Sequence, residues 1–100
     1  MKLFARHISL EDQEKALSTQ DVRICVGTPN RLLKLCERGA LNVERLRLCV
    51  LDLGRDAKDF NLFDTMVHEV RRDFWSLFHQ FLAQRIKTAP DDRPAQLCLY

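Results

Sequence analysis

A short apolar segment runs directly into Gly-Thr-Pro, and a helical pattern begins at once behind it. The apolar segment covers residues 22–26, Thr28 fits an N-cap, and Pro29 fits the first helical position, where its missing N–H costs nothing. A helix that begins in this way presents backbone N–H groups and the positive end of its dipole, which suits a phosphate. This order of strand, turn and helix therefore predicts an α/β fold with a candidate phosphate-binding turn.

Strand-like and helical patterns alternate along the whole chain. The predicted strands cover residues 2–7, 22–26, 47–52 and 96–100, and the predicted helices cover about 9–17, 29–39 and 61–87. Such alternation argues for right-handed crossovers and a parallel sheet with helices on both faces. The strand at 47–52 is almost continuously apolar, as expected for a buried parallel strand. We expect a sheet of about four strands in one domain, residues 1–100, because this length allows one modest core.

Two local signals mark the ends of predicted helices. Ser9 is followed three residues later by Asp12, which resembles a capping box at a helix start. Gly39 follows the helix that begins at Pro29, and glycine suits the C′ position behind a helix.

Composition excludes several classes of protein. A hydrophobic content of 46% is ordinary for a globular chain, so we do not expect disorder. A net charge of +2 argues against a strongly basic binder but leaves room for a local basic face. The apolar runs are too short to span a membrane, and the first residues lack the apolar core of a signal peptide. We therefore expect an intracellular chain with no membrane partner.

The four cysteines lack the spacing of metal ligands; they are Cys25, Cys36, Cys49 and Cys98. Cys25, Cys49 and Cys98 fall inside predicted strands, where a thiol behaves as a small buried hydrophobe. We expect inert core thiols, with no metal site and no catalytic cysteine.

The helix behind the turn carries basic residues on one side. Arg31, Lys34 and Arg38 recur at helical spacing. One interpretation is a small basic strip that contacts phosphates weakly and without sequence choice. The other is a solvated helix face whose Arg31 pairs with an acid. Asn30 adds a side chain beside the turn, which can donate to a phosphate or crowd it.

The last predicted helix carries an apolar and aromatic stripe. Its members alternate spacings of four and three: Phe63, Val67, Val70, Phe74, Leu77 and Phe81, widened by Trp75, Phe78 and Leu82. Such a stripe is expected to pack into the core. The alternative is a platform on which nucleic-acid bases stack.

Two of these segments resemble a known family. Gly-Thr-Pro-Asn-Arg at residues 27–31 and the strand ending Val-Leu-Asp at 50–52 are similar, in order and spacing, to the first RecA-like domain of DEAD-box RNA helicases. The resemblance covers about residues 2–56 and implies a partial RecA-like, P-loop NTPase-type fold. It also implies that the turn and helix start hold an RNA backbone phosphate. The implied RNA-binding residues are Gly27, Thr28, Asn30, Arg31 and Lys34.

The second motif departs from that of active helicases. The family has Asp-Glu-Ala-Asp where this chain has Asp52, Leu53, Gly54 and Arg55. In the family the first aspartate helps to hold Mg²⁺ and the glutamate positions the attacking water. Leu53 can neither orient water nor accept its proton, and no glycine-rich phosphate loop is present. We therefore expect no ATP hydrolysis, no catalytic residue, no cofactor and no small-molecule substrate.

The two altered motifs, Thr-Pro-Asn-Arg at 28–31 and Asp-Leu-Gly-Arg-Asp at 52–56, are similar to those of the CMS-type ribosomal small subunit homologues. That resemblance implies a nuclear, nucleolar protein with a degenerate helicase-like domain, of which this chain is a part lacking the phosphate-loop segment. The implied partners are RNA, as pre-rRNA or in a snoRNA-containing particle, and pre-ribosomal proteins. A fragment of a longer protein and a short natural product both fit this interpretation.

Three functions follow in order of preference. The first is a non-catalytic helicase-like module in small-subunit ribosome biogenesis and pre-rRNA processing, which binds RNA backbone weakly and without sequence preference. The second is a structural or protein-interaction fragment of a degenerate helicase fold that does not bind RNA. An active ATPase or helicase ranks below both.

Overall fold

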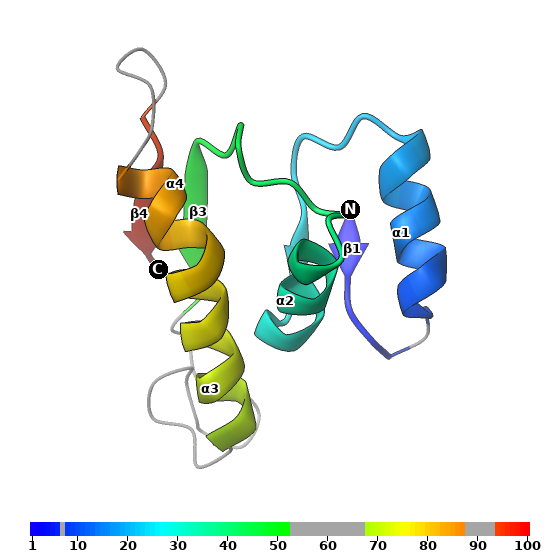
Figure 1. The fold of residues 1–100 in the computed structure, drawn as a ribbon, viewed down its shortest axis with the longest axis horizontal. Coiled ribbons are helices and arrows are strands. Elements are labelled where there is room, and N and C mark those ends of the chain that lie inside the picture. Colours follow the sequence, from blue (N-terminus) through cyan, green and yellow to red (C-terminus); the bar gives the residue numbers. More distant parts are fainter. Residues whose placement is uncertain (7, 53–67, 88–93) are drawn as a thin grey trace. The chain divides into compact units, whose positions relative to one another are not determined.

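The computed structural model describes residues 1–6, 8–52, 68–87 and 94–100, in which strands and helices alternate (Figure 1). The elements are β1 (Lys2–Leu3), α1 (Leu10–Thr19), β2 (Val26–Gly27), α2 (Pro29–Glu37), β3 (Leu48–Leu51), α3 (His68–Leu77), a π-helical segment (Phe78–Leu82), α4 (Ala83–Lys87) and β4 (Gln96–Leu99). The predicted α/β class is confirmed. Among the described helices, none combines the length and the apolar character that crossing a membrane requires.

The chain divides into two compact units, and each holds one pair of parallel strands. Unit 1 is Met1–Asn42 and unit 2 is Val43–Tyr100. Strand β1 pairs with β2 over two residues, and β3 pairs with β4 over four. The predicted parallel pairing is confirmed, but the described strands form two separate pairs where one sheet of about four was expected. Because β1 and β2 are so short, they offer few backbone groups to a further strand.

Unit 1 is built from local capping signals and a small apolar core. The Ser9 side chain accepts a hydrogen bond from the Asp12 N–H at 3.1 Å, so the predicted helix start is confirmed. Gly39 ends α2 with a φ of 75°. Its N–H donates to the Cys36 carbonyl at 3.0 Å, and the next N–H donates to the Leu35 carbonyl at 2.9 Å. This pair of bonds is a Schellman motif, and Leu35 behind it is fully buried.

Unit 2 contains a helical run in which one π turn shifts the buried face. The Ala83 N–H donates to the Phe78 carbonyl five residues earlier. The buried apolar residues of this run are Phe74 and Leu77 before the π turn, and Leu82 at its last position. Leu82 belonged to the predicted stripe, but the prediction of a buried stripe is wrong for Val70 and Trp75, which are 36% and 41% exposed. Phe81 is only half-buried, because the spacing of a regular α-helix omits the extra residue of a π turn. The predicted helix start at 61–67, with Phe63 and Val67, lies outside the described residues.

Two further predictions of burial are wrong. The strand at 47–52 was expected to be buried, yet Leu48 and Val50 are 54% and 53% exposed. Exposed and half-buried residues alternate along β3, whereas every residue of β4 is exposed. Cys25 and Cys98 are also exposed, whereas Cys36 is buried. A strand in a two-stranded pair lacks the cover on both faces that the prediction of core thiols assumed.

Candidate functional site

The predicted turn begins helix α2 as the sequence indicates. Thr28 is extended, with φ −79° and ψ 153°, and Pro29 occupies the first helical position. The Thr28 carbonyl accepts the first helical hydrogen bond from the Leu32 N–H at 3.0 Å. The Thr28 side chain makes no capping bond and is exposed. The turn therefore has the predicted backbone, while its hydroxyl takes no part in holding it.

Gly27 is required by strand pairing, whatever else it contacts. It lies opposite Leu3 in the β1–β2 pair. A Cβ atom at Gly27 would lie 2.4 Å from the Leu3 carbonyl oxygen and 3.0 Å from the Leu3 Cβ. Such a contact is far inside van der Waals distance, so glycine allows the two backbones to approach.

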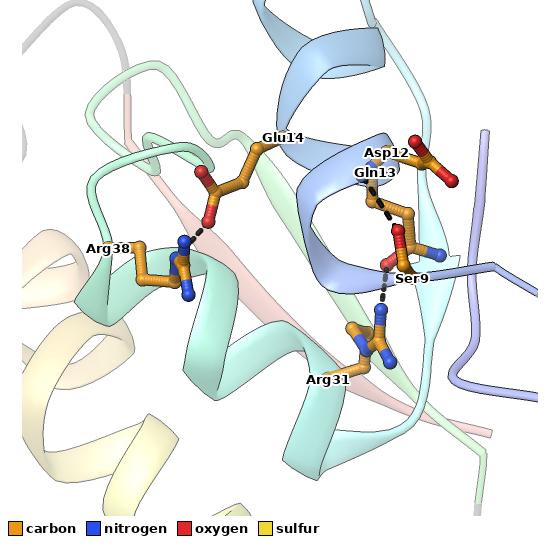
Figure 2. Close-up of polar contacts among 6 residues, drawn as sticks. All are labelled: Ser9, Asp12, Gln13, Glu14, Arg31 and Arg38. Atoms are coloured by element: carbon orange, nitrogen blue, oxygen red, sulfur yellow. Dashed lines mark hydrogen bonds and ion pairs between the residues drawn. The ribbon is translucent and has the colours of Figure 1, made fainter.

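Arg31 is directed into unit 1. Its side chain is buried, and its Nη1 donates to the Gln13 Oε1 at 3.0 Å (Figure 2). The same Nη1 donates to the Ile8 carbonyl at 3.2 Å. Gln13 is itself buried, and its Nε2 donates to the Phe4 carbonyl at 3.0 Å. Of the two interpretations of Arg31, the one in which it pairs with an acid is wrong in its partner, since both of these acceptors are neutral. A buried guanidinium needs such bonds to offset its lost hydration, and these join α2, α1 and the segment before α1.

The predicted basic strip of Arg31, Lys34 and Arg38 does not form one uniform exposed surface. Arg31 is buried, and Arg38 forms an ion pair with Glu14 of α1 (Figure 2). Lys34 is exposed. An ion pair that is partly exposed contributes only about 0–1 kcal/mol, but it engages the Arg38 charge within unit 1.

Three predicted site residues remain exposed around the turn. They are Thr28, Asn30 and Lys34, all within seven residues of one another along the chain. A hydroxyl, an amide and an ammonium group can each donate to a phosphate oxygen. This set lies in unit 1 on a helix start whose position Arg31 and Gly27 help to fix.

The degenerate second motif is described only at its first residue. Asp52 directly follows β3 and is exposed. Leu53, Gly54 and Arg55 lie outside the described residues. Within the described part of the chain, His, Cys, Asp and Glu side chains form no group of three that could hold a metal ion.

Gln13 and Glu14 are the residues that reasoning from the sequence missed. Both lie on α1; Gln13 contacts Arg31 of α2, and Glu14 contacts Arg38, which directly follows α2. A signal for Gln13 was present, because it stands three residues after Leu10 and four before Leu17, on the apolar side of the helix. A polar residue at such a position needs a buried partner.

The thiols of unit 1 are held in their neutral form. Burial raises the pKa of Cys36 to about 11, with smaller contributions from Cys25 and Glu37. The surroundings of the Cys25 sulfur raise its pKa as well, mainly by desolvation, although the residue as a whole is exposed. A thiol with a raised pKa is a weak nucleophile at neutral pH.

The alternating elements and the turn at residues 27–29 place the chain in the α/β class. The sequence model of the family described as "CMS1: U3-containing 90S pre-ribosomal complex subunit" matches residues 1–100. The chain therefore belongs to the CMS1 family, and the predicted CMS-type family is confirmed.

Curated relatives agree with this assignment. Protein CMSS1 of Danio rerio is 44% identical over 85 residues, which cover 84% of this chain and 28% of the relative. Protein CMS1 of Chaetomium thermophilum is 48% identical over 64 residues, covering 63% and 26%. Protein CMSS1 of Homo sapiens is 37% identical over 78 residues, covering 77% and 27%. The chain thus spans about a quarter of the length of these relatives. No solved structure matches it.

Proposed function

We propose that the chain is a non-catalytic module of ribosome biogenesis that acts within a pre-ribosomal complex in the nucleolus. The observation that carries this proposal is the family match, which extends over all 100 residues and names a 90S pre-ribosomal complex subunit. The partners of the module are then pre-ribosomal proteins and pre-ribosomal RNA. Its resemblance to a degenerate helicase domain accounts for a phosphate-binding turn without an ATP-hydrolysing centre.

The RNA contact in this proposal is weak and independent of sequence. Thr28, Asn30 and Lys34 offer donors to backbone phosphates, while Gly27 and Arg31 hold the turn in place. Few phosphate contacts give an affinity that falls as salt rises, and phosphate contacts carry no sequence information.

The test is a salt titration of RNA binding by fluorescence anisotropy. We compare the 100-residue chain with an Asn30→Ala, Lys34→Gln double variant and with Lys15→Gln, which removes one exposed charge from α1. The double variant should bind labelled single-stranded RNA several-fold more weakly at low salt. Its log–log salt slope should be smaller by roughly 0.7 for the phosphate contact of Lys34. An unchanged slope, or an equal loss in Lys15→Gln, would refute the assignment of the turn.

The module is non-catalytic in this proposal because Leu53 replaces the residue that positions the attacking water in DEAD-box helicases. An alkyl side chain cannot act as a general base. Purified protein should release no phosphate from ATP above the buffer rate, and Asp52→Ala should change nothing. ATP turnover that Asp52→Ala abolishes would establish the opposite conclusion.

A protein-binding function without RNA is the second candidate, and one observation favours it. Two of the three basic side chains predicted to form the strip are engaged inside unit 1. If this candidate holds, RNase treatment leaves co-purification of pre-ribosomal proteins intact, and the anisotropy assay detects no RNA binding at low salt.

A further inference from the structure

Helix α3 of unit 2 carries an exposed aromatic group beside a buried one. Phe74 is only 2% exposed, whereas its neighbour Trp75 is 41% exposed. His79, one helical turn later, and Arg72, three residues earlier, are exposed as well. Spacings of three and four place Arg72 and Trp75 of α3 and His79 of the π-helical segment on one side of the helical run.

The indole of Trp75 is supported along its edges by its neighbours. The Phe74 and Phe78 rings lie 5.1 Å and 5.8 Å from it, at interplanar angles of 65° and 87°. The His79 ring lies 5.9 Å away and is tilted by only 30°. Edge-to-face contacts at these distances are favourable. They reduce the freedom of the indole while a large part of its surface stays exposed.

The charge around this aromatic group suits a nucleic acid. The helical run of residues 68–87 contains four basic residues, Arg71, Arg72, Arg85 and Lys87, against two acidic ones, Glu69 and Asp73. Arg85 is buried. Arg72 lies 3.9 Å from Asp73 in a loose ion pair and remains 73% exposed. An apolar site for a protein partner would not need this excess of positive charge, whereas a phosphate backbone is attracted by it.

We propose that Trp75, with His79 and Arg72 beside it, stacks on an unpaired base of single-stranded RNA. Unpaired bases stack on Trp, His and Arg side chains in RNA recognition, and the contact tolerates any base because every base has a π-face. The ligand rests on the proposed function, in which the chain meets RNA. The choice of Trp75, His79 and Arg72 is independent of the proposed turn, because these residues belong to unit 2 and the turn belongs to unit 1.

Trp75 is the one tryptophan of the sequence, so intrinsic fluorescence reports on it alone. We titrate the 100-residue chain with a 12-nucleotide single-stranded RNA, with the same RNA as a duplex, and with inorganic polyphosphate. The single strand should quench the emission, and polyphosphate should not. The Trp75 variants lose this emission, so their binding is measured by fluorescence anisotropy of labelled RNA: Trp75→Ala should weaken single-strand binding about tenfold, while Trp75→Phe should retain part of the affinity because it keeps a ring. Far-UV circular dichroism confirms that each variant is folded.

The Asn30→Ala, Lys34→Gln variant separates this proposal from the preceding one. If both hold, that variant binds more weakly but still reaches full quenching at saturation. Three results would overturn base stacking and leave the turn assignment standing. They are RNA binding without quenching, equal quenching by the duplex, and unchanged affinity in folded Trp75→Ala. If RNA quenches the emission fully and the Asn30→Ala, Lys34→Gln variant binds RNA as tightly as the wild type, the assignment of the turn is overturned and base stacking stands. Failure to bind RNA at low salt, with quenching only by a protein partner, overturns both.

Discussion

Gly27 and Gly39 are required in unit 1 for different physical reasons. A side chain at Gly27 would collide with the Leu3 backbone, whereas nothing lies within 4 Å of a Cβ built at Gly39. Gly39 is instead constrained by its positive φ of 75°, which asparagine tolerates better than other residues. Gly27→Ala should therefore lower the free energy of unfolding by about 1–3 kcal/mol.

Gly39→Asn is the matched control for this prediction. It should cost well under ~1 kcal/mol, and urea denaturation followed by circular dichroism measures both variants. Equal midpoints for Gly27→Ala and the wild type would show that β1 and β2 do not approach as described.

The Arg31–Gln13 contact is a second prediction at the scale of the residue. Gln13→Ala leaves a buried guanidinium with fewer acceptors, so it should cost about 1–3 kcal/mol. Arg31→Met should cost a similar amount, but the double variant should cost less than the sum, since neither polar group is then left alone. Gln20→Ala, at an exposed glutamine, serves as the control. Additive costs in the double-mutant cycle would mean that the two side chains do not interact.

Cys36 gives a prediction about pH. Its pKa in the folded protein is raised from 9.0 to about 11, so folding disfavours its thiolate. This contribution to stability is fully present below pH 9.0 and is lost as the pH rises toward about 11. At pH 8, iodoacetamide should modify exposed Cys98 first and Cys36 last, as read by peptide mass spectrometry. Rapid modification of Cys36 in the folded chain would contradict its burial.

At the scale of the element, the π turn decides which side chain of the helical run is buried. Leu82 is 5% exposed, whereas Phe81 is only half-buried. Leu82→Ala should therefore cost about 2–5 kcal/mol, and Phe81→Ala should cost less even though phenylalanine is larger. Urea midpoints compare the two variants. The reverse order would contradict the burial of Leu82 at the π turn.

The elements also show what the sequence determines locally and what it does not. The helix starts at Ser9 and Pro29 and the helix end at Gly39 were predictable, because each depends on the chemistry of a few adjacent residues. The burial of Arg31 was not, because its acceptors lie 18 and 23 residues away along the chain. The π turn was missed because a hydrophobic pattern is read with a fixed period of 3.6 residues.

At the scale of the whole molecule, the family of the chain could be predicted from the sequence more fully than the arrangement of its strands. The altered motifs at 28–31 and 52–56 were specific enough to predict the CMS-type family, which the match over residues 1–100 confirms. The arrangement of strands was not predictable to the same degree. Local patterns predict parallel strands, but whether two pairs join into one sheet depends on contacts between distant segments.

The central claim is that the chain works as a non-catalytic component of a pre-ribosomal complex. The most direct measurement is sucrose-gradient sedimentation of the protein from cell extracts, with pre-rRNA detected in each fraction. The wild type and Asp52→Ala should both co-sediment with large precursor particles, and the Asn30→Ala, Lys34→Gln variant should shift partly toward the top of the gradient. Wild-type protein found only at the top of the gradient, or loss of co-sedimentation in Asp52→Ala, would contradict the claim.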